Sequence, residues 1–248
     1  MGKYMALCML CLCCSLGNAA GQKKTVLIAI TSGTQLNVKG STVTLGYWGE
    51  ELTAPLKALE SAGIAVEFAS PKGTALLDPS SVDPRWSSTE TVHLVKETDA
   101  RLRQAGMLKL ADAHAQDYDA ILVVGGHGAM FDLNRNPDML RLLRRAYAEG
   151  KIVAAECHGT GALAFAGLIK NVPVTGFPEA WEPAELKGSL PYSLEAELDK
   201  VSGGKYRSGL KEGEAPKPLV IMSGRIITSR DPMSSLAMGE ALVKALGK

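Results

Sequence analysis

The chain has 248 residues, of which 46% are hydrophobic and 21% are charged, and its formal net charge is +1. This composition excludes a mainly disordered chain, because disordered segments are poor in apolar residues and rich in unbalanced charge. The balanced charge and the 5% share of aromatic residues argue against a nucleic-acid-binding protein, which presents a basic or base-stacking surface.

The amino terminus has the pattern of an export signal. Lys3 is the only charge before residue 23, residues 6–16 are apolar, and Gly17-Asn18-Ala19 places small residues where a signal peptidase cleaves. The apolar run is shorter than the roughly 20 residues that span a bilayer. We therefore expect a signal peptide over 1–19, a secreted or periplasmic protein, and a single domain over 20–248. An uncleaved membrane anchor is the alternative.

Strands and helices alternate along the rest of the chain. Short apolar, β-branched runs predict strands over 24–30, 64–69, 120–124, 151–155, 219–222 and 225–228, and helical spacing predicts helices over 47–62, 137–148 and 231–246. This alternation predicts an α/β fold with a mostly parallel central sheet and helices on both faces. The more polar stretches 72–118 and 179–215 are expected to be irregular insertions or lids.

Cys157 is the candidate nucleophile. It is the one cysteine of five that lies beyond residue 14, so the body of the chain has no partner for a disulfide. It follows a predicted strand and precedes Gly159 and a small-residue helical stretch, as a strand-to-helix elbow requires. A helix amino terminus beyond it would favour the thiolate. The alternative is a buried, inert cysteine.

Three neighbouring features complete the candidate site. His158 follows the cysteine directly and could act as its base. The Gly125-Gly126-His127-Gly128 loop ends another predicted strand, and its backbone N–H groups suit an oxyanion hole, although a plain turn is the alternative. Glu50 and Glu51 open the first long helix, where a glutamate is usually solvated.

Several segments together resemble the ThiJ/PfpI superfamily. They are AAECHG (154–159), GGHGAMFDL (125–133), GYWGEELTAP (46–55), VTGFPEAWE (174–182), LPYSLEAEL (190–198) with GGKY (203–206), and the closing residues 224–246. Within that superfamily the chain looks like the branch of heat-shock chaperones and cofactor-free glyoxalase III enzymes, often described as class I glutamine amidotransferase-like. True amidotransferases use a histidine far downstream of the cysteine, and this chain has no histidine after His158.

The resemblance implies a flavodoxin-like three-layer sandwich with Cys157 on its nucleophile elbow. It implies that Glu51, four residues before Pro55, reaches the cysteine, and that His158 is the partner of the cysteine. Glu182 would orient that histidine.

Backbone N–H groups of Gly126 and His158 would form the oxyanion site, with His127 lining the pocket.

The chain departs from the family pattern at Trp181, where relatives often have a small or acidic residue. It departs again at Ser229-Arg230-Asp231, where Gln-Asn is usual before the proline.

The resemblance implies a lyase with a Cys-His-Glu site that converts reactive 2-oxoaldehydes, such as methylglyoxal to D-lactate, without glutathione, metal or other cofactor, as stress protection. Deglycase or cysteine-hydrolase activity would use the same Cys157. A holdase chaperone and a redox-responsive protein are the alternatives from other classes. The expected partner is a small carbonyl substrate, with no nucleic acid, no stable membrane partner and a homodimer as the compatible assembly.

Overall fold

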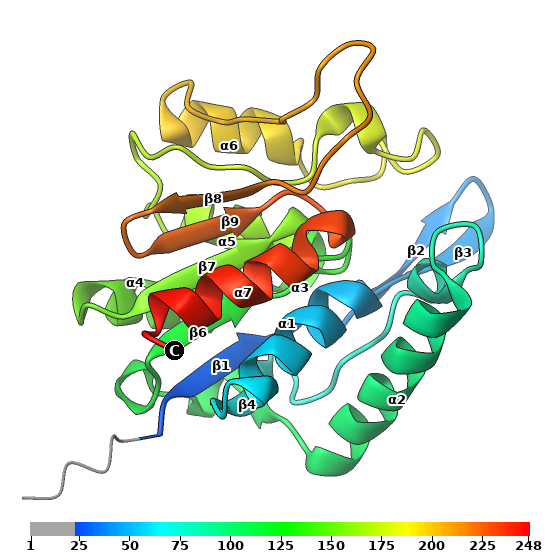
Figure 1. The fold of residues 1–248 in the computed structure, drawn as a ribbon. Coiled ribbons are helices and arrows are strands. Elements are labelled where there is room, and N and C mark those ends of the chain that lie inside the picture. The colour runs from blue at the N-terminus through cyan, green and yellow to red at the C-terminus, as the bar shows by residue number, and fades with distance from the viewer. Residues whose placement is uncertain (1–22) are drawn as a thin grey trace, which may run out of the picture.

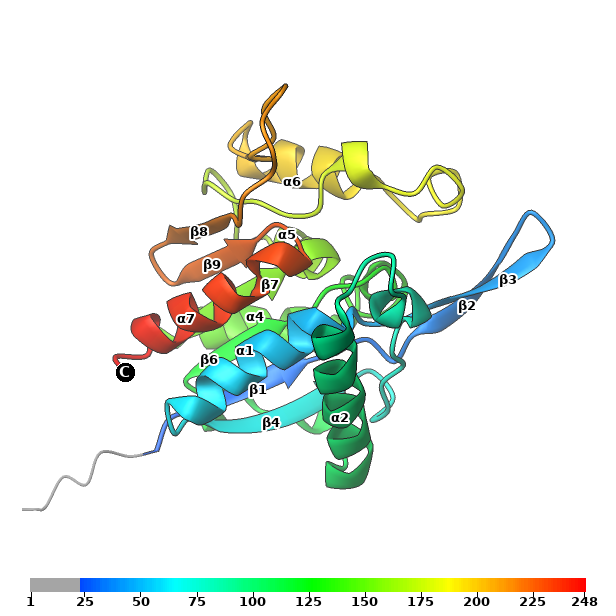
Figure 2. The same cartoon turned by 45° about the vertical axis from the view of Figure 1, so that its right-hand side comes forward.

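The computed structural model describes residues 23–248, and one seven-stranded sheet forms its centre (Figure 1). The strands lie in the order β5-β4-β1-β6-β7-β9-β8, and every neighbouring pair is parallel except β8 and β9. Their bounds are β1 (Thr25–Ala29), β4 (Ala65–Ser70), β5 (Leu108–Lys109), β6 (Ala120–Val123), β7 (Ile152–Glu156), β8 (Val220–Ser223) and β9 (Ile226–Ser229). A separate hairpin, β2 (Thr34–Val38) and β3 (Ser41–Leu45), extends away from the sheet (Figure 2).

Helices cover both faces of the sheet. One face carries α1 (Gly49–Ser61), α2 (Thr89–Ala105) and α7 (Ser235–Ala245), and the other carries α3 (Ala129–Asp132), α4 (Pro137–Ala148) and α5 (Gly161–Phe165), with α6 (Leu194–Ser202) packed on α5. Strand β6 shows why both faces are covered, because its apolar side chains alternate between them. Ile121 and Val123 pack into the core on one face of the sheet, and Ala120 and Leu122 pack into the core on the other. The predicted three-layer α/β sandwich is confirmed.

The two polar stretches are more regular than expected. Residues 72–118 contain the 17-residue helix α2, and residues 179–215 contain α6. Each helix starts at a serine that accepts a backbone hydrogen bond, Ser88 for α2 and Ser193 for α6. The prediction of irregular structure was wrong because α2 buries only a narrow face that includes polar side chains. Asp99, for example, accepts a hydrogen bond from the buried Tyr47 hydroxyl at 2.8 Å.

The predicted signal peptide over 1–19 lies outside the described residues, as does the domain boundary placed after it. Within residues 23–248, no helix is both long and apolar enough to cross a bilayer.

Helices α1 and α7 lie side by side on the face shown in Figure 1. They approach closely at Gly239, where a Cβ atom would lie 2.8 Å from Ala58 Cβ and 2.9 Å from Pro55 Cα. The glycine therefore lets α7 hold α1 against the sheet, and α1 is the helix that carries Glu51.

We expect Gly239→Ala to lower the free energy of unfolding by about 1–3 kcal/mol, because overpacking outweighs the gain in helix propensity. Urea unfolding followed by circular dichroism measures this change. Glu240→Ala, at the exposed neighbouring position, should stay within about 0.5 kcal/mol of the parent. A more stable Gly239→Ala protein would show that the two helices separate without cost.

Candidate functional site

Cys157 stands on a strained turn at the carboxyl end of β7. It begins a 3-10 helix (Cys157–Thr160) and has φ of 50°, a left-handed conformation that non-glycine residues rarely adopt. The turn is tight, because a Cβ at Gly159 would lie 2.8 Å from the carbonyl oxygen of Val124. Thr160 Oγ1 donates to the Cys157 carbonyl oxygen at 2.7 Å and closes the turn. The predicted elbow is therefore present.

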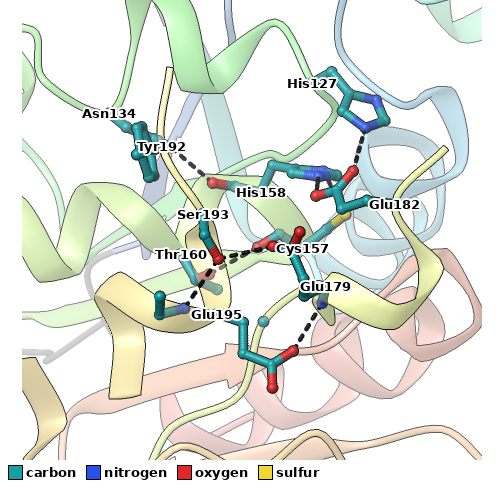
Figure 3. Close-up of polar contacts among 12 residues, drawn as sticks. His127, Asn134, Cys157, His158, Thr160, Glu179, Glu182, Tyr192, Ser193 and Glu195 are labelled. Atoms are coloured by element: carbon teal, nitrogen blue, oxygen red, sulfur yellow. Dashed lines mark hydrogen bonds and ion pairs between the residues drawn. The ribbon is translucent and has the colours of Figure 1, made fainter. Parts of the chain in front are cut away.

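A chain of short polar contacts leads away from the cysteine sulfur (Figure 3). Cys157 Sγ lies 3.2 Å from Nδ1 of His158, and Nε2 of His158 lies 2.9 Å from Oε1 of Glu182. The other oxygen of Glu182 lies 2.9 Å from Nε2 of His127. One carboxylate is thus shared by two imidazoles.

The protonation of this cluster follows from its hydrogen bonds. Burial opposes ionisation of Glu182, but its contacts with His127 and His158 hold the pKa at about 2. An ionised carboxylate only accepts hydrogen bonds, so both facing Nε2 atoms carry the proton. Burial also lowers the pKa of His158 to about 4. His158 is then a neutral imidazole at pH 7 whose free Nδ1 faces the sulfur, which is the arrangement of a general base.

Glu51 approaches the cysteine from the first turn of α1. Its side chain is fully buried, and neither carboxyl oxygen has a hydrogen bond of standard geometry. A Cβ at Gly125 would clash with Glu51 Oε2 and lie 2.7 Å from Cys157 Cβ, so the missing side chain of Gly125 makes room for both groups. Burial raises the pKa of Glu51 to about 8, against the opposing effect of its contact with the Cys157 sulfur. Glu51 is therefore mainly protonated at neutral pH.

The expectation that the thiolate of Cys157 is favoured is wrong in this environment. Burial raises the pKa of the Cys157 thiol well above its usual value, and the neighbouring Glu51 raises it further. Backbone N–H groups of Gly126 and His158 point at the sulfur and act in the opposite direction, but they do not dominate. The thiol is the resting form, and attack on a substrate requires transfer of its proton to His158.

Those two N–H groups are the pair that the family resemblance implies for an oxyanion site. Gly126 has φ of 95°, and a Cβ there would lie 2.6 Å from the backbone nitrogen of Trp48. Only glycine turns its N–H toward the sulfur at this position without a clash.

The structure brings all the predicted site residues together, with Cys157, His158, Glu51, Glu182 and His127 between 0% and 8% exposed. Glu50, the alternative glutamate, is only partly buried.

The sequence did not point to two further residues of the site, Phe177 and Glu156. Phe177 stacks on His158 with ring centroids 4.6 Å apart. Glu156, the residue before the cysteine, is fully buried, and Ser229 Oγ donates to its carboxyl group at 3.2 Å. Its place in the AECHG segment was the available signal.

One group of side chains within residues 23–248 could hold a metal ion. The ligand atoms of His127, His158 and Glu182 lie within 4.8 Å of one another, and Zn²⁺ accepts such nitrogen and oxygen donors. Their facing atoms already satisfy one another by hydrogen bonds.

Residues 42–245 match the DJ-1/PfpI family. The chain belongs to this family. It is 25% identical over 232 residues to glyoxalase 3 of Candida albicans, covering 89% of this chain and 97% of that protein. It is 28% identical over 215 residues to the glutathione-independent glyoxalase hsp3102 of Schizosaccharomyces pombe, covering 81% and 89%.

Solved structures agree with these matches. Glyoxalase III of Candida albicans superposes with a TM-score of 0.73 at 26% identity over 90% of this chain and 97% of that chain. The Rapid Encystment Protein of 24 kDa from Francisella tularensis gives a TM-score of 0.77 at 29% identity, covering 90% and 99%. The resemblance to the glyoxalase III branch of DJ-1/PfpI proteins is thereby confirmed.

These relatives also correct the predicted location. Four relatives that align along 81–90% of the chain are fungal glyoxalases, and none of them is named as an exported protein. The expectation of a secreted or periplasmic protein is therefore wrong. The homodimer and the expected lack of nucleic-acid and membrane partners stay predictions.

The raised pKa of Glu51 predicts a pH-dependent stability. The folded state keeps a proton on Glu51 up to about pH 8, whereas the unfolded chain loses it near pH 4.5, so this group stabilises the fold fully below pH 4.5 and less as pH rises toward 8. Glu51→Gln removes the titration, so its stability relative to the parent should rise by a few kcal/mol, in order of magnitude, between pH 5 and pH 8.

Urea unfolding of both proteins at several pH values measures this difference. Glu50→Gln, at the adjacent and partly exposed position, is the matched control and should show a much smaller change. A constant difference between Glu51→Gln and the parent from pH 5 to pH 8 would show that Glu51 is ionised in the folded protein.

Proposed function

We propose that the protein is a glutathione-independent lyase of the glyoxalase III type, which converts a 2-oxoaldehyde such as methylglyoxal to D-lactate with Cys157 as the nucleophile. One observation carries this proposal. Two proton carriers contact the sulfur, the free Nδ1 of His158 and the carboxyl group of Glu51. A hydrolase needs one base beside its nucleophile, whereas an internal oxidation–reduction of adjacent carbons must move two protons.

The first step joins the sulfur to the aldehyde carbon, C1. The thiol proton moves to Nδ1 of His158 as the S–C1 bond forms. N–H groups of Gly126 and His158 stabilise the oxyanion on C1. His158 then returns the proton to this oxygen, which gives a neutral hemithioacetal and restores the neutral imidazole.

The second step is the isomerisation. The ionised form of Glu51 removes the C1 proton, and an enediolate forms. His158 carries the proton of the C1 hydroxyl group to the C2 oxygen and is left neutral. Glu51 then returns its proton to C2, which restores its ionised form. A lactoyl thioester on Cys157 results, with no external oxidant. A carboxyl group with a pKa of about 8 suits this task, because an effective base has a pKa close to the working pH.

Water completes the cycle by attacking the thioester carbon. His158 takes a proton from the attacking water, the C1–S bond breaks, lactate leaves, and the sulfur recovers that proton from His158. Glu182 stays ionised throughout and stabilises the imidazole whenever it carries the extra proton.

Burial of the site favours a small substrate over the alternatives. Cys157 is 3% exposed and its two proton carriers are no more exposed, so a three-carbon aldehyde fits this environment better than a glycated protein side chain. The relatives include a protein/nucleic acid deglycase HchA of Pseudomonas aeruginosa at 22% identity. A redox sensor would need an exposed, low-pKa thiolate, which this cysteine does not have. The holdase activity stays a prediction.

The test is enantiomer-specific detection of D-lactate from methylglyoxal, with purified protein in chelator and without glutathione. We expect turnover by the parent and a loss of about 10²–10⁴-fold in kcat for Cys157→Ser and for Glu51→Gln. Glu50→Gln is the matched control and should keep most of the activity.

The outcomes separate the steps of the proposal. No D-lactate from the parent protein would reject the glyoxalase function. Undiminished turnover by Cys157→Ser would reject the covalent mechanism, and undiminished turnover by Glu51→Gln would leave His158 as the only proton carrier.

A further inference from the structure

Two departures from the family pattern contact each other in space. Trp181 ends the 3-10 helix Glu179–Trp181, and Arg230 follows β9 on the way to α7. They are 49 positions apart in sequence, yet the guanidinium carbon of Arg230 lies 4.8 Å from the ring centroid of Trp181. This is the geometry of a cation–π contact.

Arg230 is held rigidly in that position. Its side chain is completely buried, and each of its three nitrogen groups has a partner. Nε donates to Asp231 Oδ2 at 2.8 Å, Nη1 donates to the carbonyl oxygen of Ser208 at 3.1 Å, and Nη2 donates to the carbonyl oxygen of Lys217 at 2.7 Å. Because each nitrogen along the edge of the guanidinium plane has a hydrogen-bond partner, the face of the plane is free to contact the indole.

Trp181 connects this cation to the catalytic cluster in two ways. Its ring meets Phe177 edge-on at 6.1 Å, and Phe177 in turn stacks on the ring of His158 at 4.6 Å. Along the backbone, Trp181 directly precedes Glu182, whose carboxylate bonds both imidazoles.

The backbone near Glu182 is held by hydrogen bonds within its own segment, from the Trp181 N–H to the Pro178 carbonyl oxygen and from the Glu182 N–H to the Glu179 carbonyl oxygen. Its upstream end is tied to α6, because the Glu179 N–H donates to Glu195 Oε2 at 2.7 Å and Ser193 Oγ donates to Glu179 Oε2 at 2.7 Å (Figure 3). Neither contact involves Trp181 or Glu182. The ring of Trp181 against Arg230 is thus the side-chain anchor next to the catalytic carboxylate.

We propose that Arg230 and Trp181 are positioning residues for the candidate triad, and that their contact fixes Glu182 and, through Phe177, the ring of His158 in the reactive geometry. Neither side chain touches the reacting sulfur. They act on the step in which His158 accepts the thiol proton, because that step needs Nδ1 aimed at Cys157 and the Nε2 proton held by Glu182. The proposal rests on the proposed function only in taking Cys157 and His158 as the reacting pair.

The key variant is Trp181→Leu, which removes the aromatic face and leaves every hydrogen bond of Arg230 in place. We expect kcat for D-lactate formation to fall about 10- to 100-fold with little change in KM, because small misplacements of catalytic groups cost rate rather than binding. Trp86→Leu is the matched control, since Trp86 is 67% exposed, and its kcat should equal that of the parent.

A double-mutant cycle distinguishes positioning from a general structural effect. If Trp181 acts through Glu182, then Trp181→Leu combined with Glu182→Gln should be no slower than Glu182→Gln alone. Arg230→Lys keeps the charge but not the flat guanidinium, and we expect it to resemble Trp181→Leu. Thermal unfolding of each variant, measured beside the kinetics, shows whether a loss of rate comes from a loss of stability.

A second readout does not depend on the glyoxalase reaction. The rate of Cys157 alkylation by iodoacetamide at pH 7 reports proton transfer from the thiol to His158, and it should fall in Trp181→Leu and in Glu182→Gln to a similar extent. One outcome is that the parent makes no D-lactate while the effects of Trp181→Leu and Glu182→Gln on the alkylation rate are non-additive. In that case the proposed function fails and the positioning role stands. Two results would overturn the positioning role. In one, the rate losses of Trp181→Leu and Glu182→Gln multiply in the double variant. In the other, Trp181→Leu keeps the parent's alkylation rate and kcat.

Discussion

The carboxylate of Glu182 accepts hydrogen bonds from two imidazoles, and the protonation of the whole site depends on this sharing. It fixes the Nε2 proton of His158 and leaves Nδ1 free toward the sulfur of Cys157. His127 takes the second oxygen, so the carboxylate is held at both oxygens and does not turn away from His158. A histidine that follows its cysteine directly in sequence can act as a base only because a distant carboxylate selects its tautomer.

Burial sets the chemical character of the other half of the site. Glu51 and Cys157 both lie away from solvent, and this environment penalises the charged form of each. The result is a pair that is mainly neutral at rest, with a protonated thiol and a carboxyl group whose pKa is about 8. Such a nucleophile is slow toward solution oxidants and electrophiles in general. In the proposed reaction it loses its proton only as an aldehyde carbon bonds to the sulfur, next to the N–H groups of Gly126 and His158.

The fold supplies these conditions through close packing around glycine and strained backbone. Gly125 makes room for Glu51 beside the cysteine, and Gly239 lets α7 hold the helix that carries Glu51. Cys157 itself adopts a left-handed conformation at the end of a strand that is buried on both faces. Backbone strain at such a position persists because the surrounding core holds it in place, which is common where a side chain must be presented for chemistry.

The sequence by itself determined the alternation of strands and helices, the elbow at Cys157 and the glycine loop at Gly126, because these depend on local hydrophobic period and on backbone sterics. It did not reveal α2, whose buried face is narrow and partly polar, nor the stacking of Phe177 on His158. Tertiary structure alone decided that Glu182 serves two histidines, that Arg230 lies on Trp181, and that the thiol rather than the thiolate is the resting form. Each of these depends on distances between segments far apart in the chain and on exclusion of water, and neither quantity is encoded in local sequence pattern.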